Sequence, residues 1–216
     1  AGEDMRVIRP WERTDLNIEE HFIEEVGRIY GHDKVASVEP EMMEVKQLNK
    51  RHYYSDKVRT ALTAAGFSEV ITSSFHKKGK IQLQNALASD KSYVRGNLRK
   101  NIEATLDKNF VHTDMLGIPD VRVFEIGTVF TPGEGMLDEH VSLALGARTK
   151  GNGYSPKDDK VLQVGLDAVA EVLGATIDWN IEKGVAETNF TALIADLSDP
   201  EGYDAFEKSV DVTYQA

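Results

Sequence analysis

An acidic cluster near the start of the chain could bind a divalent cation. His21, Glu24 and Glu25 are spaced i, i+3 and i+4, so they share one face of a predicted helix, and Asp15 lies just ahead of it. Mg²⁺ prefers hard oxygen ligands and usually takes one or two carboxylates together with water. The alternative is a solvated helix face whose acids lie near the positive end of the helix dipole.

A second candidate lies on the segment VRVFEIGTVF, residues 121–130, which predicts a strand. Arg122 and Glu125 are three residues apart and therefore point to opposite faces of that strand. An arginine on an antiparallel strand could meet a phosphate group. The alternative is structural: an ion pair across strands for the arginine and a buried partner for the glutamate.

The familiar catalytic signatures are absent from the sequence. It contains no HExxH, no GxSxG, no P-loop and no dinucleotide fingerprint after a strand. The six histidines are scattered without metal-ligand spacing. With no cysteine, disulfides, thiolate metal sites and a cysteine nucleophile are excluded.

The composition is that of an ordinary globular protein. The 216 residues are 41% hydrophobic, with 25 basic and 36 acidic side chains and a net charge of −11. This length suits one large domain, or one domain and a fragment of a neighbour. No apolar run approaches the roughly 18 residues of a membrane helix, and no signal peptide is recognisable. We therefore expect a cytoplasmic protein that makes no membrane contact.

The charge is concentrated in the last third of the chain. Residues 151–216 contain four lysines, no arginine and thirteen acidic residues, which gives −9 of the total −11. Such a surface repels phosphate backbones, whose binding requires Lys and Arg. We expect little direct contact between this region and nucleic acid.

The first part of the chain predicts a small strand–helix unit. A strand is expected at Met5–Pro10 and a helix at Ile18–Tyr30, with capping side chains in Thr14–Asn17 and a stop at Gly31. The apolar residues at helical spacing predict a buried face on that helix; they are Ile18, Phe22, Val26 and Ile29. Residues 33–44 have weak periodicity and predict a linker.

The rest of the chain predicts an α+β domain with antiparallel hairpins and helices packed on one side. The expected helices are Lys50–Ala65, Gly96–Phe110 and Lys160–Leu173. The expected strands are Phe67–Phe75, Ile81–Ala86, Val121–Phe130 with His140–Ala147 as its hairpin partner, and the short segments 177–181 and 191–197. Loops are expected at residues 150–157 and, as an acidic turn, at 199–204.

Four segments in order resemble the β subunit of bacterial phenylalanyl-tRNA synthetase. They are RTDLNIEEHFIEEVGRIYGHDKV (13–35), ALTAAGFSEVITSSF (61–75), QNALASDKSYVRGNLRKNIEATLDKN (84–109) and VRVFEIGTVF (121–130). The resemblance covers residues 5–147 well and is architectural after Gly151. It implies the end of that subunit's helical fifth domain over residues 1–36. Over residues 37–216 it implies a class II synthetase-like core, an antiparallel sheet flanked by helices.

The resemblance also implies that the two subunits of the enzyme have different functions. In this family the α subunit carries aminoacylation and binds ATP, and the β copy of the fold supports it within an (αβ)₂ heterotetramer that acts on tRNA(Phe). Class II sites need arginines around the ATP triphosphate, yet no arginine follows Arg148 in this chain. The resemblance therefore implies a degenerate nucleotide site, with Arg95, Arg122 and Glu125 as its remnants and no catalytic residue.

A Mg²⁺ site shared with the α subunit is a further implication of the resemblance. Its carboxylates map onto Asp15, Glu24 and Glu25, while His21 stands where the family has another aspartate. Nothing in the chain resembles the family's tRNA-binding, editing or anticodon-binding modules. A fragment or a reduced subunit would both account for this.

Three functional hypotheses follow. In the first, the chain is a scaffold for the α subunit, with the helices beginning at Lys50 and Gly96 as interface elements; the alternative for these helices is packing on their own sheet alone. In the second, it is a stand-alone class II ligase-like enzyme that uses Arg95, Arg122 and Glu125. In the third, it is a regulatory domain that binds an amino acid.

Overall fold

The computed structural model describes residues 6–38, 48–133, 137–151 and 153–202. Contacts divide the chain into two units, Ala1–Val45 and Lys46–Ala216. The domain boundary expected after residue 36 lies close to the stretch 39–47, which is outside the described residues.

The first unit contains one helix, α1 (Glu19–Tyr30), within its described residues, followed by the short 3₁₀ turn η1 (His32–Lys34). The helix and its end at Gly31, where φ is 99°, are confirmed. The predicted strand is wrong for residues 6–10, which pair with no other strand in the described chain. The predicted cap is also wrong, because the N-cap position is Ile18, outside Thr14–Asn17, and no side chain caps the helix there.

The predicted buried face of α1 does not form within this unit. Ile18, Val26 and Ile29 are all more than half exposed, and no residue of α1 is buried. The reason is size: no other described element of the unit is large enough to cover an apolar stripe on a helix.

The second unit is built on a sheet of five strands within the described residues. The strands are β1 (Ser68–Glu69), β5 (Asp120–Pro132), β6 (Leu137–Thr149), β8 (Val185–Asn189) and β7 (Asn180–Glu182), in that order across the sheet. All neighbours are antiparallel except β1 and β5, which are parallel. The predicted hairpin of β5 and β6 is confirmed and is longer than expected.

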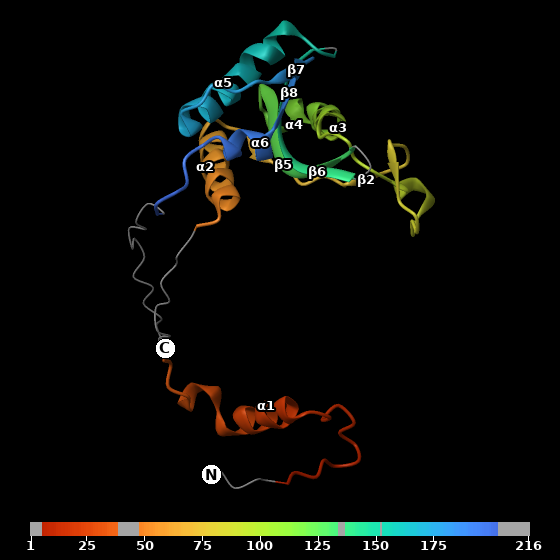
Figure 1. Cartoon of the computed structure of the whole chain (residues 1–216), viewed down its shortest axis with the longest axis vertical. Coiled ribbons are helices and arrows are strands. Elements are labelled where there is room, and N and C mark those ends of the chain that lie inside the picture. The colour runs from red at the N-terminus through yellow and green to blue at the C-terminus, as the bar shows by residue number, and fades with distance from the viewer. Residues whose placement is uncertain (1–5, 39–47, 134–136, 152, 203–216) are drawn as a thin grey trace. The chain divides into compact units, whose positions relative to one another are not determined.

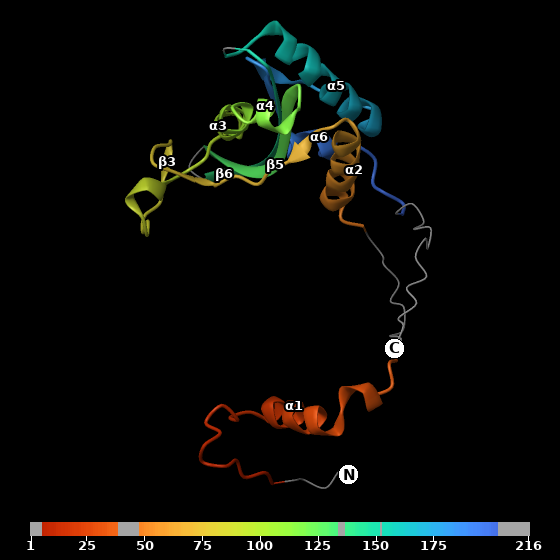
Figure 2. The same cartoon turned by 180° about the vertical axis from the view of Figure 1, so that it is seen from behind.

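Helices cover both faces of this sheet (Figures 1 and 2). The helices α2 (Lys50–Ala64), α5 (Pro156–Leu173) and α6 (Phe190–Ala195) pack on one face, and α3 (Arg99–Phe110) packs on the other. The one-turn helix α4 (Thr113–Leu116) follows α3. The α+β fold with a sheet flanked by helices is confirmed, whereas the expectation of helices on one side only is wrong.

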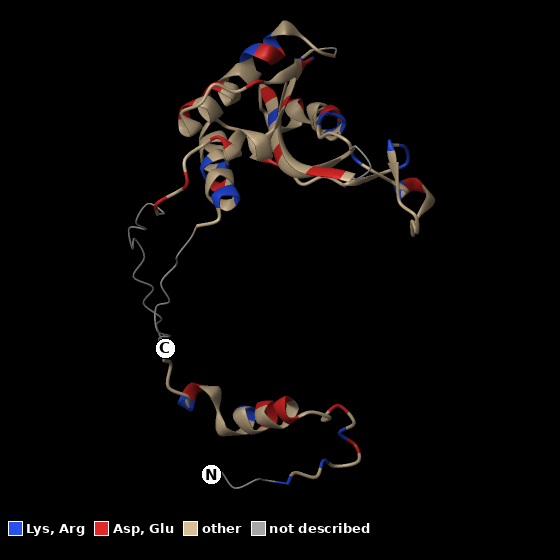
Figure 3. Cartoon of the chain, viewed as in Figure 1, with Lys and Arg blue, Asp and Glu red and all other residues tan. Residues whose placement is uncertain are grey.

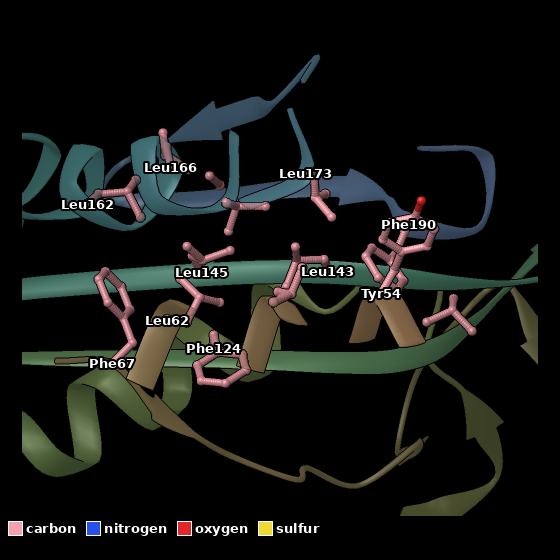
Figure 4. Close-up of a cluster of buried hydrophobic side chains, with 14 of the residues drawn as sticks. Tyr54, Leu62, Phe67, Phe124, Leu143, Leu145, Leu162, Leu166, Leu173 and Phe190 are labelled. Atoms are coloured by element: carbon pink, nitrogen blue, oxygen red, sulfur yellow. The ribbon is translucent and has the colours of Figure 1, made fainter. Parts of the chain in front are cut away.

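The larger core lies between the sheet and the helices α2 and α5, as Figure 4 shows. Alternate residues of β6, Leu143 and Leu145, face this core, while Ala144 between them faces α3. Three apolar residues on one side of α2 are buried in it: Tyr54, Val58 and Leu62. That face of α2 therefore packs on its own sheet and is not available to a partner.

A small sheet extends from the domain and replaces two longer predicted strands. It consists of β2 (Phe75–His76), β4 (Tyr93–Val94) and β3 (Ile81–Gln82), with the 3₁₀ turn η2 (Ser89–Lys91) before β4. The predicted strand Phe67–Phe75 is formed only at its two ends, in β1 and β2. Between these ends the segment forms no strand and is held to β5 by isolated hydrogen bonds, such as that from Val70 N to Phe124 O at 2.8 Å.

The C-terminal predictions were less accurate. The helix α5 begins at Pro156 rather than Lys160, because Ser155 and Asp158 form a capping box. The segment 191–197 was predicted as a strand, but α6 spans most of it, and the Asn189 side chain caps that helix by accepting from Ala192 N at 2.9 Å. The strand β8 was not predicted. The acidic turn expected at 199–204 lies partly outside the described residues.

The close approach of α3 to the sheet predicts a substitution effect. A Cβ at Gly146 of β6 would lie 2.4 Å from Ile102 Cγ2 and 2.9 Å from Leu106 Cδ1, both on buried side chains of α3. Gly146→Ala should therefore lower the free energy of unfolding by about 1–3 kcal/mol through overpacking. Urea unfolding measures this. Gly151→Ala is the control, since a Cβ there meets nothing within 4 Å, and an equal loss in the two variants would contradict the packing.

Candidate functional site

The structure separates the predicted nucleotide-site residues onto two faces of the sheet. Arg122 lies on the face of α2, where its Nη1 donates to Ala65 O at 3.1 Å just after that helix ends. Its Nε and Nη2 donate to the Asp120 carboxylate at 2.7 and 3.1 Å, and this pairing raises the pKa of the guanidinium. Arg122 thus joins β5 to the end of α2, and it does not meet Glu125.

Glu125 and Arg95 form a buried ion pair on the opposite face, beside α3. Arg95 Nη1 lies 2.7 Å from Glu125 Oε1, and the two side chains are 5% and 3% exposed. Arg95 Nε also donates to Thr128 O at 2.7 Å. A buried pair needs such additional bonds, because the attraction alone does not offset the loss of hydration.

Thr72 and Asn101 complete this polar cluster. Thr72 donates to Glu125 through both its amide (3.2 Å) and its hydroxyl (2.6 Å). Asn101 Nδ2, from α3, donates to Thr72 Oγ1 at 2.6 Å and to Ser73 O at 3.0 Å. The cluster therefore connects β5, the segment after β1 and helix α3.

A second carboxylate lies in the same row of the sheet. Ala144 of β6 pairs with Glu125 on one side and with Glu187 of β8 on the other, so both glutamates are on the α3 face. The Glu187 carboxylate accepts from the backbone amides of Leu98 (2.9 Å) and Arg99 (3.2 Å). It therefore occupies the start of α3, where unpaired amides and the helix dipole favour an anion.

Arg99 is also held by the chain itself. Its guanidinium donates to three carbonyl oxygens of the β7–β8 hairpin: Asn180 (2.6 Å), Val185 (3.1 Å) and Glu182 (3.3 Å). The roles of Arg99 and Glu187 were not predicted from the sequence. The sequence signal for Arg99 is its place beside Lys100 near the start of the predicted helix, and the sequence holds no such signal for Glu187.

The predicted metal ligands in the first unit are held by arginines. Arg13 Nη2 lies 2.7 Å from Asp15 Oδ2 and 2.6 Å from Glu25 Oε1, and Arg28 Nη2 lies 2.6 Å from Glu25 Oε2. The hydrogen bonds from Arg13, with Arg28 adding to them at Glu25, lower the pKa of both carboxyls to about 2. Glu24 is exposed and takes no part in these contacts.

This arrangement does not fit a metal ion. No group of three or more His, Asp or Glu side chains in the described ranges is placed to hold one, and the carboxylates of Asp15 and Glu25 already face guanidinium groups. The expected Mg²⁺ site is therefore not formed by these residues as they are arranged in this chain.

Comparison with known proteins gives the family. Residues 36–188 match the phenylalanyl tRNA synthetase beta chain CLM domain. The chain belongs to this family. Among its relatives are two proteins named phenylalanine–tRNA ligase beta subunit. The one from Rickettsia conorii is 29% identical over 209 residues, which is 89% of this chain and 24% of that protein. The one from Staphylococcus aureus is 30% identical over 193 residues, which is 85% of this chain and 22% of that protein.

The chain thus spans about a quarter of the length of these relatives. The match to the CLM domain contains Arg95, Glu125 and Glu187, whereas Asp15 and Glu25 lie outside it. A crystal structure of pyrrolysyl-tRNA synthetase from Desulfitobacterium hafniense superposes with a TM-score of 0.47 at 18% identity, covering 91% of this chain and 78% of that one. None of the described helices is long and apolar enough to cross a membrane.

Removing one partner of the buried pair should be costly. Arg95→Met leaves the Glu125 carboxylate buried without its cation, so we expect a loss of about 3–5 kcal/mol in the free energy of unfolding. The double variant with Glu125→Leu should lose less than the sum of the two single variants, since neither charge remains. Urea unfolding of all four proteins tests this. Arg59→Met is the control, because its pair with Glu69 is about one-third exposed and should contribute about 1 kcal/mol or less.

The ion pairs of the first unit predict a pH dependence. The pKa values of Asp15 and Glu25 are lowered to about 2 from ordinary values of 3.8 and 4.5. A lowered folded-state pKa means that these pairs stabilise the unit at neutral pH and that this contribution is lost as pH falls from about 4 toward about 2. NMR titration of the carboxyl carbons should show Arg13→Gln raising both pKa values. Arg6→Gln removes the same charge nearby, and an equal rise there would contradict the assignment to Arg13.

Proposed function

We propose that this chain is part of the β subunit of a phenylalanine–tRNA ligase and acts as a non-catalytic partner of an α subunit. Family membership supports the first statement. The second rests on one observation: on the α3 face of the sheet the charged groups Arg95, Glu125, Arg99 and Glu187 are all held by other groups of the chain. The ligase, as a whole, attaches phenylalanine to tRNA(Phe) at the expense of ATP.

The chemistry of ATP supports a non-catalytic role. A triphosphate that reacts with an amino acid must be held by cations in fixed positions. Here the Arg95 guanidinium is paired with Glu125, Arg99 is bound to three carbonyls, and the amides at the start of α3 are bound to Glu187. An incoming phosphate would have to displace the buried carboxylate of Glu125 or the half-buried carboxylate of Glu187. In this proposal ATP, with its Mg²⁺, is bound by the α subunit only.

An α subunit is the partner that this function implies, in an (αβ)₂ heterotetramer. Exposed apolar side chains in the second unit, which a subunit interface would cover, support it; they include Ile71, Leu87 and Met115, which are 94%, 105% and 78% exposed. Contact with tRNA would come through other parts of the assembly, because the last third of this chain is strongly acidic. The cytoplasm is the compartment that this role implies.

The experiment is phenylalanine-dependent ATP–pyrophosphate exchange combined with co-purification. The chain alone should give no exchange and should bind the α subunit in a stable complex. Exchange catalysed by the chain alone would contradict the proposal and favour the stand-alone ligase. Phenylalanine binding without exchange and without a complex with α would favour the amino-acid-binding regulatory domain.

A further inference from the structure

A basic pocket lies on the other face of the sheet, away from the Arg95–Glu125 pair. It has a volume of about 520 Å³ and is formed by the first half of α2 together with β5 and β6. The residues that line it are Asn49, Arg51, His52, Ser55, Arg59, Ile126, Gly127, Thr128 and Val141. Figure 3 shows the basic residues that gather on α2.

The pocket has the charge of an anion site. Two arginines and a histidine line it, and none of the described lining residues is Asp or Glu, although the chain has 36 acidic against 25 basic side chains. Arg51, Ser55 and Arg59 are spaced i, i+4 and i+8 and therefore form one row on α2. A local cluster of one sign in an oppositely charged chain concentrates attraction for an anion.

Ser55 is the observation that points to a ligand. It is 6% exposed, lines the pocket, and its hydroxyl has no hydrogen-bond partner among the described residues. The hydroxyl is not one of the buried polar atoms without a hydrogen-bond partner in the described chain, which are Arg148 Nε and Asp159 Oδ1, so it is open to the pocket and free to donate. A ligand oxygen in the pocket would accept the hydrogen bond that the protein does not provide.

Other donors around the pocket are also available. Arg59 binds Glu69 through its Nε at 2.9 and 3.0 Å, which leaves its two terminal nitrogens for a ligand. Arg51 forms no ion pair within the described chain. Asn49 accepts from His52 N at 3.0 Å through its Oδ1, so its amide nitrogen remains a donor.

We propose that this pocket binds the phosphate group of a small phosphorylated ligand. The Ser55 hydroxyl, the Asn49 amide and the guanidinium groups of Arg51 and Arg59 would donate to its oxygens, an arrangement that suits a tetrahedral oxyanion. A small ligand is favoured over a nucleic-acid backbone because Ser55 is only 6% exposed and residues 151–216 of the same chain carry a charge of −9. The site is separate from the α3 face and does not depend on the proposed function.

The test is calorimetric and NMR titration with inorganic phosphate and pyrophosphate at constant ionic strength. Amide shifts should gather around Ser55 and Thr128. Ser55→Ala and Arg51→Gln should each weaken binding about tenfold, the effect of losing one charge-assisted hydrogen bond. Ser55→Ala removes a hydroxyl that has no partner in the described chain. The unfolding temperature of the ligand-free variant should therefore not fall below that of the unmodified chain.

Lys57→Gln is the matched control, because it removes one positive charge from the same helix outside the pocket and should change the affinity less than twofold. No binding of phosphate or pyrophosphate, or equal weakening by Lys57→Gln, would overturn the proposal. Tighter binding of a short single-stranded RNA, abolished by Ser55→Ala and Arg51→Gln, would assign the pocket to a nucleic-acid backbone and would overturn it as well.

Discussion

The buried pair of Arg95 and Glu125 connects parts of the second unit that lie far apart in the sequence. The backbone around Arg95 bonds to Ser74 O through its amide (2.9 Å) and accepts from Phe130 N (3.0 Å), while its side chain reaches β5. The geometry leaves no room for another side chain, since a Cβ on Gly127 would lie 2.4 Å from Arg95 Nη2. The glycine in the sequence FEIG is therefore required by the guanidinium beside it.

A polar contact between distant segments also explains how α3 begins. The first amides of a helix have no partners within the helix. Glu187 of β8, which pairs with Ala144 of β6, supplies the acceptor for them at the start of α3. Two glutamates in one row of the sheet thus each bind donors on the α3 side: Glu125 binds the Arg95 guanidinium, and Glu187 binds two backbone amides. These contacts stabilise the domain, and in the proposed non-catalytic role they leave Arg95 and Arg99 unavailable to a triphosphate.

Local sequence patterns predicted those helices and strands whose secondary structure depends mainly on their own residues. The helices α2 and α3 and the β5–β6 hairpin have clear periodicity and long runs, and the opposite orientations of Arg122 and Glu125 follow from strand geometry alone. The segment 191–197 was misassigned because a short apolar run fits a strand or a helix, and the cap at Asn189 decided between them.

The remaining errors concern contacts that no local pattern encodes. The partnership of Glu187 with α3 depends on the register of β6 and β8. The apolar stripe of α1 predicted a buried face, but its burial requires an element that the described first unit does not contain. The acids near α1 fitted a metal site by spacing, but Arg13 lies between Asp15 and Glu25.

The most direct measurement is an amide NMR titration of the chain with ATP and Mg²⁺, read at Thr72, Leu98 and Arg99. These amides report on the Arg95–Glu125 cluster and on the bonds to Glu187. The account predicts that their resonances stay in place, and that the amides of Leu98 and Arg99 exchange slowly with solvent until Glu187→Ala exposes them. Saturable shifts of these resonances on addition of ATP would contradict it, because they would show that a nucleotide enters the face that the glutamates close.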